Sequence, residues 1–523
     1  MINLTTIAKF VIRKTLLILI IFWLFGVILF LSLEVSDREH LTISLTEEST
    51  SKCRGEGRAV FCEYTNFCVD RKNGAYIVNR KDISKLANVM NADQNIDFFW
   101  KPKVKSRYPA KAQYINDTLF AYGLYSPVHF SHWMFNGLLP LYSIMRSYNA
   151  TRNAWLLRIH TYRHQPIRMI PQDISFLTDG KEIVFDSFDT LTEMQVLPPK
   201  VPICFAKAVV GFGNRCSLNY CENNIPAEHY EQFRKDVFSH FIHNGQWELY
   251  KQKKYKDQRE LACIDSTKIY APIVSNDKIY HTKVIIGVLQ RYHTRHILNA
   301  DELIDALVKQ NYTVKFLNFD VGCSLPATAK LLEDIDVLIT PHGNGLGDAI
   351  FMMPKTTVIS IDNRFYSEAW FTYVHTASGR RFYNFQCDSG DCQVADFELA
   401  QKGLQEDGIR MSYHDLLEYL GPKYPYRLIE KYYVGDDKSG YDRYAKDAVR
   451  RVDVEKLVKF VKEIIEEWPM VKNKSFIELC EMGKCCGPWC SDALKKNVFA
   501  KGNAWGGVER PIDAETVNWK AGN

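Results

Sequence analysis

The sequence predicts an α/β protein that is anchored in a membrane near its N-terminus, and three observations carry this prediction. After Tyr280, apolar runs of strand length alternate with helical segments, which is typical of a parallel sheet covered on both faces. A 19-residue run without charge, Thr15 to Leu33, is long enough to cross about 30 Å of hydrocarbon. At 523 residues the chain exceeds one comfortable core, so we expect two domains with appendages.

The charges beside the apolar run predict its orientation. Three basic residues precede it and three acidic residues follow it: Lys9, Arg13 and Lys14, then Glu34, Asp37 and Glu39. The positive-inside rule therefore predicts a cytosolic tail at 1–14, a signal anchor at 15–33 and a luminal remainder. A cleaved signal peptide is the alternative, but no small-residue cleavage site follows the run. Residues 34–58, rich in Ser, Thr and Glu, predict a flexible stem.

The cysteines and the glycosylation acceptors fit an oxidising lumen. All 14 cysteines follow the anchor, and an even number suits a disulfide framework. Four Asn-X-Ser/Thr acceptors lie on the same side: Asn116, Asn149, Asn311 and Asn473. The Cys-rich tail, 474–523, contains "CEMGKCCGPWC", which could bind zinc but is predicted to form disulfides in a lumen.

The remaining segments predict two domains and a helical end. Residues 59–278 mix short strands with helical stretches such as "HWMFNGLLPLYSIMR". Residues 279–400 alternate strands ("TKVIIGVLQR", "YTVKFLNF", "DVLIT", "TTVISID") with helices ("ADELIDALVKQ", "PATAKLLED" and one beginning at "GLGDAIFMM"). Within 401–473, "DVEKLVKFVKEIIEEW" is an amphipathic helix that we expect to pack on the core rather than bind a partner. The net charge of +5 is spread along the chain, which favours no nucleic-acid partner.

The segment "TPHGNGLGDAIFMM", residues 340–353, follows a predicted strand and is a candidate binding loop. Gly343-Asn344-Gly345 would let the backbone approach a ligand closely. The N-terminus of the next helix would favour an anionic group, and His342 would add a ring donor beside it. On this interpretation a side chain at Gly345 blocks the ligand and leaves the fold largely intact. The alternative is a tight turn that needs glycines for steric reasons only.

Two arginines favour the binding interpretation. Arg291 and Arg295 come just after the first strand of the same sheet, and the carboxyl ends of parallel strands meet at one rim. Guanidinium groups are permanently charged, bidentate donors, so two of them near a helix start suit a diphosphate. Either arginine alone would be interpreted as part of a solvated turn.

Four segments together resemble glycosyltransferase family 61. They are "HFSHWMFNGLLPLY" (129–142), similar to the family's "NFGHFLLDGLLPLY", then "ICFAKAVVGFG" (203–213), "RYHTRHILNADEL" and "DVLITPHGNGLGDAIFMMPKTTVISI". The resemblance implies a GT-B arrangement of two facing Rossmann-like domains, in an enzyme of the Golgi or endoplasmic reticulum membrane. It implies inverting transfer of GlcNAc, xylose or arabinose from a UDP-sugar to a glycan or glycoprotein acceptor. The implied UDP-binding residues are Arg291, Arg295, His342, Gly343, Asn344, Gly345 and Leu346.

The resemblance also implies how the transfer is catalysed. No convincing Asp-X-Asp metal site stands out, so we expect no cofactor and a metal-independent reaction in which the arginines replace a cation. His132 is the candidate base, and in a regular helix it shares one face with Asn136, at i and i+4. The alternative is that His132 only braces its segment by hydrogen bonding.

Several departures from the family pattern favour a second hypothesis. Asn136 stands where the family usually has Asp, and Ser360 where Glu is common. Asn344 and Asp348 also replace the usual residues. The second hypothesis is therefore a catalytically inactive, membrane-tethered relative that binds glycans or nucleotides.

Overall fold

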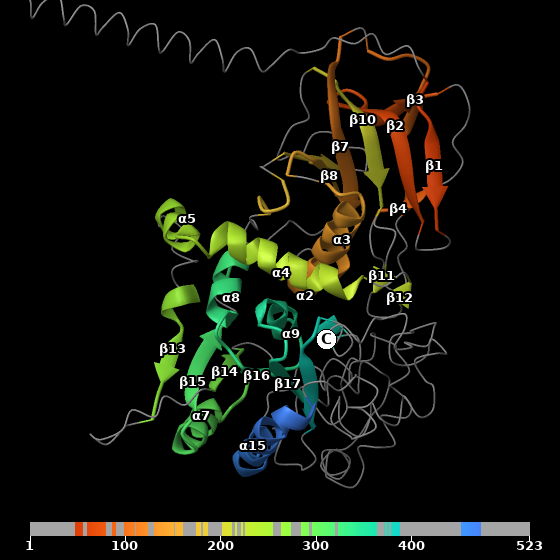
Figure 1. Cartoon of the computed structure of the whole chain (residues 1–523). Helices are drawn as coiled ribbons and strands as arrows, with labels where there is room; N and C mark the ends of the chain where they lie inside the picture. Colours follow the sequence, from red (N-terminus) through yellow and green to blue (C-terminus); the bar gives the residue numbers. More distant parts are fainter. Residues whose placement is uncertain are drawn as a thin grey trace, which may run out of the picture.

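The described part of the protein is a mixed α/β structure with two large sheets (Figure 1). This computed structural model describes residues 48–55, 60–79, 86–89, 99–109, 111–123, 130–150, 152–160, 174–178, 181–186, 201–211, 215–216, 221–222, 225–254, 263–272, 284–291, 295–319, 323–362, 371, 374–375, 378–386 and 451–471. Among these residues, no helix has the length and apolar character needed to span a membrane. The predicted anchor, 15–33, and the Cys-rich tail, 474–523, lie outside the described residues.

The second sheet has the parallel arrangement that the sequence predicts. Its order is β13-β15-β14-β16-β17-β18, and every pairing is parallel except that of β13 with β15. The strands are β13 (Lys268–Tyr270), β14 (Ile285–Gln290), β15 (Thr313–Asn318), β16 (Val337–Pro341), β17 (Thr357–Asp362) and β18 (Arg381–Gln386). The residues of β16 are all buried, because helices cover both faces of the sheet.

Helices cover the two faces of this sheet as two separate layers (Figure 1). On one face, α7 (Ala300–Lys309) and α15 (Val454–Val471) share an apolar core with the strands. The helix predicted at 453–468 is thus confirmed as a core-packing helix, with Leu457, Val461 and Ile464 fully buried. On the other face lie α4 (Ala227–Phe241) and α8 (Leu325–Leu332). A shorter helix, α5 (Gln246–Lys254), follows α4.

The first sheet differs from the Rossmann-like sheet that the family resemblance implies. It has the order β6-β3-β2-β10-β7-β8-β9, with β1 paired to β2. Its neighbouring strands pair in parallel except where β2 pairs with β1, β3 and β10. β2 runs against β3 because the two form a hairpin, whose turn is closed by the Asp70 carboxylate accepting from the Asn73 N–H. The strands are β1 (Ser51–Arg54), β2 (Phe61–Asp70), β3 (Gly74–Val78), β6 (Lys103–Lys105), β7 (Gln113–Gly123), β8 (Trp155–His160), β9 (Glu182–Asp186) and β10 (Ile203–Val210).

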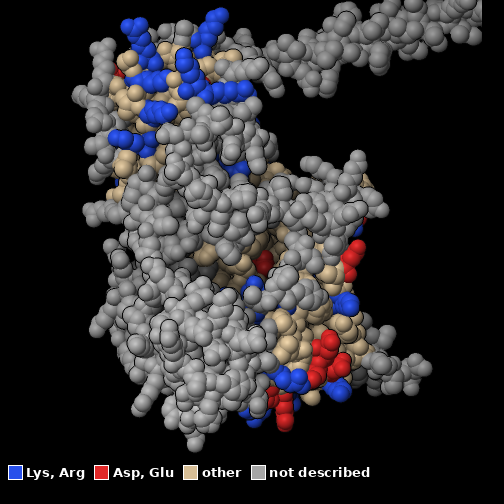
Figure 2. Space-filling view, turned by 180° about the vertical axis from the view of Figure 1, so that it is seen from behind, with Lys and Arg blue, Asp and Glu red and all other residues tan. Residues whose placement is uncertain are grey.

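Two pairs of short strands lie outside these sheets. β4 (Ala87–Asn88) pairs with β5 (Phe99–Trp100), and β11 (Arg215–Cys216) pairs with β12 (Cys221–Glu222). Lys and Arg side chains gather over the part of the molecule that contains the first sheet (Figure 2). The edge strand β6 carries an exposed lysine, Lys103, and a lysine on an edge strand discourages pairing with another chain.

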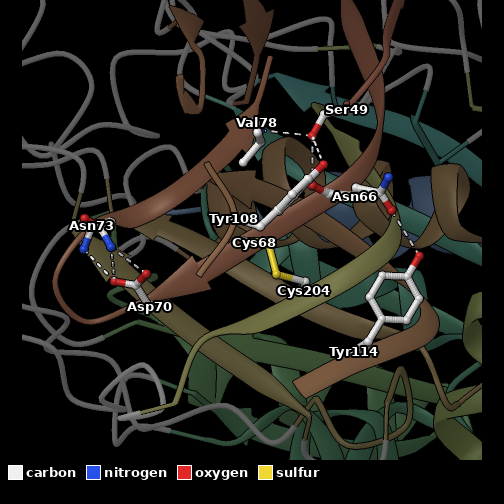
Figure 3. Close-up of a disulfide and its surroundings, with 9 residues drawn as sticks. All are labelled: Ser49, Asn66, Cys68, Asp70, Asn73, Val78, Tyr108, Tyr114 and Cys204. Carbon is white, nitrogen blue, oxygen red and sulfur yellow. Dashed lines mark hydrogen bonds between the residues drawn. A yellow bond between two sulfur atoms is a disulfide. The ribbon is translucent and has the colours of Figure 1, made fainter. Parts of the chain in front are cut away.

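Three disulfides among the described residues support the predicted disulfide framework. Cys68–Cys204 joins β2 to β10 inside the first sheet (Figure 3), Cys53–Cys62 joins β1 to β2, and Cys263–Cys323 lies beside α8. The pairing of β1 differs from the expected stem, because Ser51–Arg54 forms an ordered strand inside the range 34–58. Likewise β13, expected in the N-terminal domain of 59–278, pairs with a strand of the second sheet.

Candidate functional site

The strand order of the second sheet indicates where a ligand would bind. β14 comes before β15 and β16 in the chain, and it lies between them in the sheet. The connection from β14 leads to β15 on one side and the connection from β16 leads to β17 on the other, so the strand order reverses between β14 and β16. Sheets of this kind bind ligands at that point, beyond the carboxyl ends of the strands. Arg291 follows the end of β14 directly, and His342 follows the end of β16. The structure thus brings the two predicted binding segments to the switch point.

Both predicted arginines converge on Gly343. A Cβ atom placed on this glycine would lie 2.6 Å from Nη1 of Arg295 and 2.9 Å from Nη1 of Arg291. The Nη1 of Arg295 also donates a hydrogen bond to the His342 carbonyl oxygen at 3.0 Å. Gly343 has φ +131°, in a region that side chains of L-residues rarely adopt. The loop therefore needs glycine here both for its backbone conformation and to leave room for the two guanidinium groups.

Gln290, which the sequence analysis missed, closes the loop that carries the arginines. This buried residue ends β14, and its Oε1 accepts from the backbone N–H of Arg291 at 3.0 Å and of Ile297 at 2.9 Å. Its Nε2 donates to the Ile297 carbonyl at 2.7 Å. Arg295 lies between these two bonded positions with φ +59°, a strained conformation for arginine. The available signal in the sequence was a polar amide at the end of an otherwise apolar strand.

The expected role of Gly345 needs a correction. A Cβ at this position would lie 2.5 Å from Cδ2 of Leu289 and 2.9 Å from Oγ1 of Thr340, so it points into the core. A side chain here would therefore disturb packing rather than block a ligand. The Leu346 side chain, also expected at the site, is fully buried in the core that the two sheets share. The glycine that faces the arginines is Gly343.

The segment after the loop is also less helical than the sequence predicts. α9 covers only Gly345–Asp348, and a 3₁₀ turn, η3 (Ala349–Phe351), follows it. Because so short a helix has a small dipole, the arginines carry most of the positive charge available for an anion. The His342 imidazole is fully buried, with Nδ1 3.5 Å from Oγ of Ser360 and its ring edge-on to Phe371. Through these contacts the imidazole packs the binding loop against β17 and Phe371.

The predicted base segment packs directly against this loop. It consists of α2 (Phe130–Trp133), the π-helix η2 (Met134–Leu138) and α3 (Leu139–Ser147). The hydroxyl of Ser131 lies 3.0 Å from Oδ1 of Asn344. His132 is partly buried in α2, and Asn136 lies within the π-helix, so the i, i+4 argument for a regular helix does not apply across this pair.

Aromatic rings connect the base segment to the binding loop. Phe371 lies edge-on to His342 and also to Phe135, which belongs to the π-helix. Phe135 in turn lies edge-on to His375, whose ring stacks on Phe382. His375 is fully buried, and among the residues that the structure describes neither of its ring nitrogens has a hydrogen-bond partner. Burial, with the nearby Arg380 charge, lowers the pKa of His375 to about 3.

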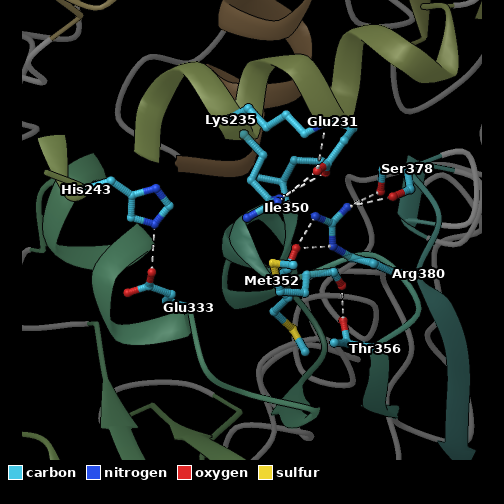
Figure 4. A network of polar contacts seen from close by, with 11 residues as sticks. Glu231, Lys235, His243, Glu333, Ile350, Met352, Thr356, Ser378 and Arg380 are labelled. Carbon is cyan, nitrogen blue, oxygen red and sulfur yellow. Dashed lines mark hydrogen bonds and ion pairs between the residues drawn. The ribbon is translucent and has the colours of Figure 1, made fainter. Parts of the chain in front are cut away.

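Arg380 fixes the far end of the short helix that follows the loop (Figure 4). Its guanidinium donates to the carbonyl oxygens of Ile350, at 2.6 Å, and of Met352, and to Oγ of Ser378 at 2.6 Å. These carbonyls would otherwise lack partners at the end of a buried helix. Burial, followed by the nearby Arg234 charge, lowers the pKa of Arg380 to about 9.

The comparisons with known proteins agree with the resemblance seen in the motifs. Residues 130–359 match the family described as Glycosyltransferase 61. A stretch of 74 residues is 30% identical to the alpha-1,3-arabinosyltransferase XAT3 of Oryza sativa subsp. japonica. A stretch of the same length is 32% identical to the beta-1,2-xylosyltransferase XAX1 of the same plant. Each match covers 14% of this chain and 13% of the relative.

We expect Gly345→Ala to destabilise the fold. The new methyl group would press on the buried Leu289, and overpacking of a core typically costs about 1–3 kcal/mol. Urea unfolding measures the loss. The double variant with Leu289→Ala should lose less unfolding free energy than the two single variants lose in total, because the shortened side chain at position 289 leaves room for the methyl group. Full additivity would mean that the two side chains do not meet.

We expect His375 to make the protein sensitive to acid. The folded state keeps this imidazole neutral, while in the unfolded state it binds a proton below about pH 6.5. Its contribution to stability is therefore complete above pH 6.5 and is lost as the pH falls towards 3. Between pH 7 and pH 5, the wild type should lose about 2 kcal/mol more unfolding free energy than His375→Phe. Parallel profiles for the two proteins would contradict this assignment.

Proposed function

Because residues 130–359 match the glycosyltransferase 61 family, we propose that the protein is an inverting glycosyltransferase. It moves a sugar from a UDP-sugar to a hydroxyl group of a glycan or glycoprotein acceptor. The observation that supports this proposal best is the convergence of Arg291 and Arg295 on Gly343 at the switch point of a parallel sheet. Two bidentate cations beside the backbone of a loop glycine suit a diphosphate.

The chemistry of the transfer fits these groups. The acceptor oxygen attacks the anomeric carbon, the bond from that carbon to the β-phosphate oxygen breaks, and UDP leaves with the electron pair. Negative charge grows on the diphosphate in the transition state. Arg291 and Arg295, which are held in place before the reaction, would stabilise it. In this proposal they do the work of a divalent cation, so transfer is metal-independent and needs no cofactor.

The acceptor hydroxyl must also lose a proton, and His132 is the proposed base. It lies in α2, whose neighbouring residue Ser131 bonds to the binding loop, so the imidazole belongs to a segment fixed beside the diphosphate site. Histidine titrates near neutral pH, which suits proton removal from a hydroxyl in the transition state. Asn136 has no carboxylate and in this proposal contributes only hydrogen bonds.

The two similar rice proteins guide the choice of donor. One is named as an arabinosyltransferase and the other as a xylosyltransferase, so we propose UDP-pentoses first and UDP-GlcNAc next. We propose that the enzyme resides in the Golgi or endoplasmic reticulum membrane, held by 15–33 as a single-pass anchor with the catalytic part in the lumen. The three disulfides support an oxidising compartment.

The competing hypothesis is an inactive relative that binds nucleotide or glycan. Hydrolysis of UDP-sugars by the purified luminal region, residues 48–523, separates the two. Release of UDP from UDP-xylose, UDP-arabinose or UDP-GlcNAc supports the enzyme. Binding of UDP without any release supports the inactive relative.

We expect each of Arg291→Ala and Arg295→Ala to weaken UDP binding by about 1.5–3 kcal/mol, the usual contribution of a hydrogen bond to a charged group. Lysine should restore only part of the affinity, because it cannot form a bidentate contact. Calorimetric titration with UDP measures the effect. Arg451→Ala is the matched control, since Arg451 is an exposed residue of the same domain that pairs with Glu302. Equal UDP affinity in all variants would refute the diphosphate site.

We expect the protein to carry N-linked glycans when it is expressed in eukaryotic cells. The acceptor residues Asn116, Asn149 and Asn311 are all exposed, so a transferase in the lumen can reach them. Treatment with an endoglycosidase should lower the apparent mass, and replacing the three asparagines by glutamine should remove most of the shift. An unchanged mass would show that this part of the chain does not face the lumen.

A further inference from the structure

A hydrogen bond joins the base segment to the binding loop. The Ser131 hydroxyl donates to Asn344, with Oγ 3.0 Å from Oδ1 and 3.2 Å from the backbone oxygen. The serine is almost fully buried, so water competes little for this bond. The two residues are 213 positions apart in the sequence, and the bond therefore fixes tertiary structure.

Close packing of the two backbones sets the geometry of this bond. A Cβ atom on Gly347 would lie 3.0 Å from both Cα and Oγ of Ser131. Any side chain at position 347 would push α2 away from α9 and lengthen the bond. The contact therefore depends on Gly347 as well as on the two bonded residues.

The bond connects neighbours of the two chemically important groups. Ser131 precedes His132, the proposed base, and Asn344 follows Gly343, on which the arginines converge. In the family segment quoted above, Gly occupies the position of Ser131, and glycine has no side chain that can form a hydrogen bond. Asn344 also replaces the residue that is usual in the family. Two departures from the family pattern thus meet in one contact.

We propose that Ser131 is a positioning residue, whose bond to Asn344 sets the distance between His132 and the diphosphate at Gly343. This inference rests on the proposed function. The binding loop itself is held by other hydrogen bonds, among them those from Arg295 to the His342 carbonyl and from the His342 N–H to Ile361. Loss of the Ser131 hydroxyl therefore changes the rate of transfer and leaves UDP affinity intact.

The test compares Ser131→Ala, Asn344→Ala and the double variant with the wild type. The readouts are kcat and KM for the UDP-sugar that the wild type hydrolyses fastest, together with calorimetric UDP affinity. Each single variant should lower kcat about three- to tenfold, as expected for one buried hydrogen bond, and Ser131→Ala should keep KM and UDP affinity within about twofold of the wild type. The double variant should be no slower than the slower single variant, because one interaction is lost in all three.

Ser147→Ala is the matched control. Its hydroxyl donates to the Ser143 carbonyl of its own helix and makes no bond to the loop, so its kcat should equal that of the wild type. Three results would each overturn the positioning role. They are a wild-type kcat in Ser131→Ala, additive losses of kcat in the double variant, and a loss of UDP affinity in Ser131→Ala as large as its loss of kcat. A wild type that binds UDP but releases none from any UDP-sugar would instead refute the proposed function, and the inference with it.

Discussion

The candidate site depends on holding two positive charges against one glycine. Arg291 and Arg295 repel each other, and a loop that was free to move would separate them. Gln290 prevents this by bonding to both ends of the loop, and the His342 carbonyl accepts a hydrogen bond from Arg295. The repulsion that remains is a reason for the site to favour an anion, since a bound diphosphate would remove it. The surrounding sheet provides the rigid rim that this arrangement needs.

The two sheets share a helical layer, and this layer connects the site to the rest of the molecule. One apolar core contains residues from the first sheet, from α3 and α4, and from the second sheet. Arg380 bonds to the carbonyls that end the helical turns after the loop, so the loop is fixed at both of its ends. The chain of rings from His342 through Phe371 and Phe135 to His375 runs through the same layer. A change in one of these packed groups would reach the others.

Much of the second sheet could be predicted from the sequence, because buried parallel strands are continuous apolar runs. The strands at β14, β15, β16 and β17, and the helices α7 and α8, lie where the pattern indicates. The convergence of the two arginines also followed from the pattern, since parallel strands end at one rim. The direction in which a side chain on a loop glycine would point could not be predicted. Whether Gly345 faces a ligand or Leu289 depends on how the turn packs in three dimensions.

Other features of the structure could not be predicted from the sequence, for related physical reasons. The role of Gln290 depends on a loop whose ends meet in space, and no local pattern marks such closure. The antiparallel placement of β2 in the first sheet depends on its hairpin with β3, whose turn at Asp70–Asn73 the family resemblance did not imply. The unpartnered ring nitrogens of His375 are a tertiary property as well, because only the fold decides which groups surround a buried side chain.

The π-helix at Met134–Leu138 has a consequence for the rotational phase of its segment. An α-helix advances by about 100° per residue, whereas a π-turn closes over five residues and so holds one residue more than an α-turn. Loss of a single residue between Trp133 and Leu139 would restore a regular helix. The turn that carries His132 would then keep its direction relative to the buried face of α3, because the wide turn and the α-turn each complete one revolution. The wide turn therefore accommodates one additional residue between His132 and Leu139 without rotating the base away from the face that α3 buries.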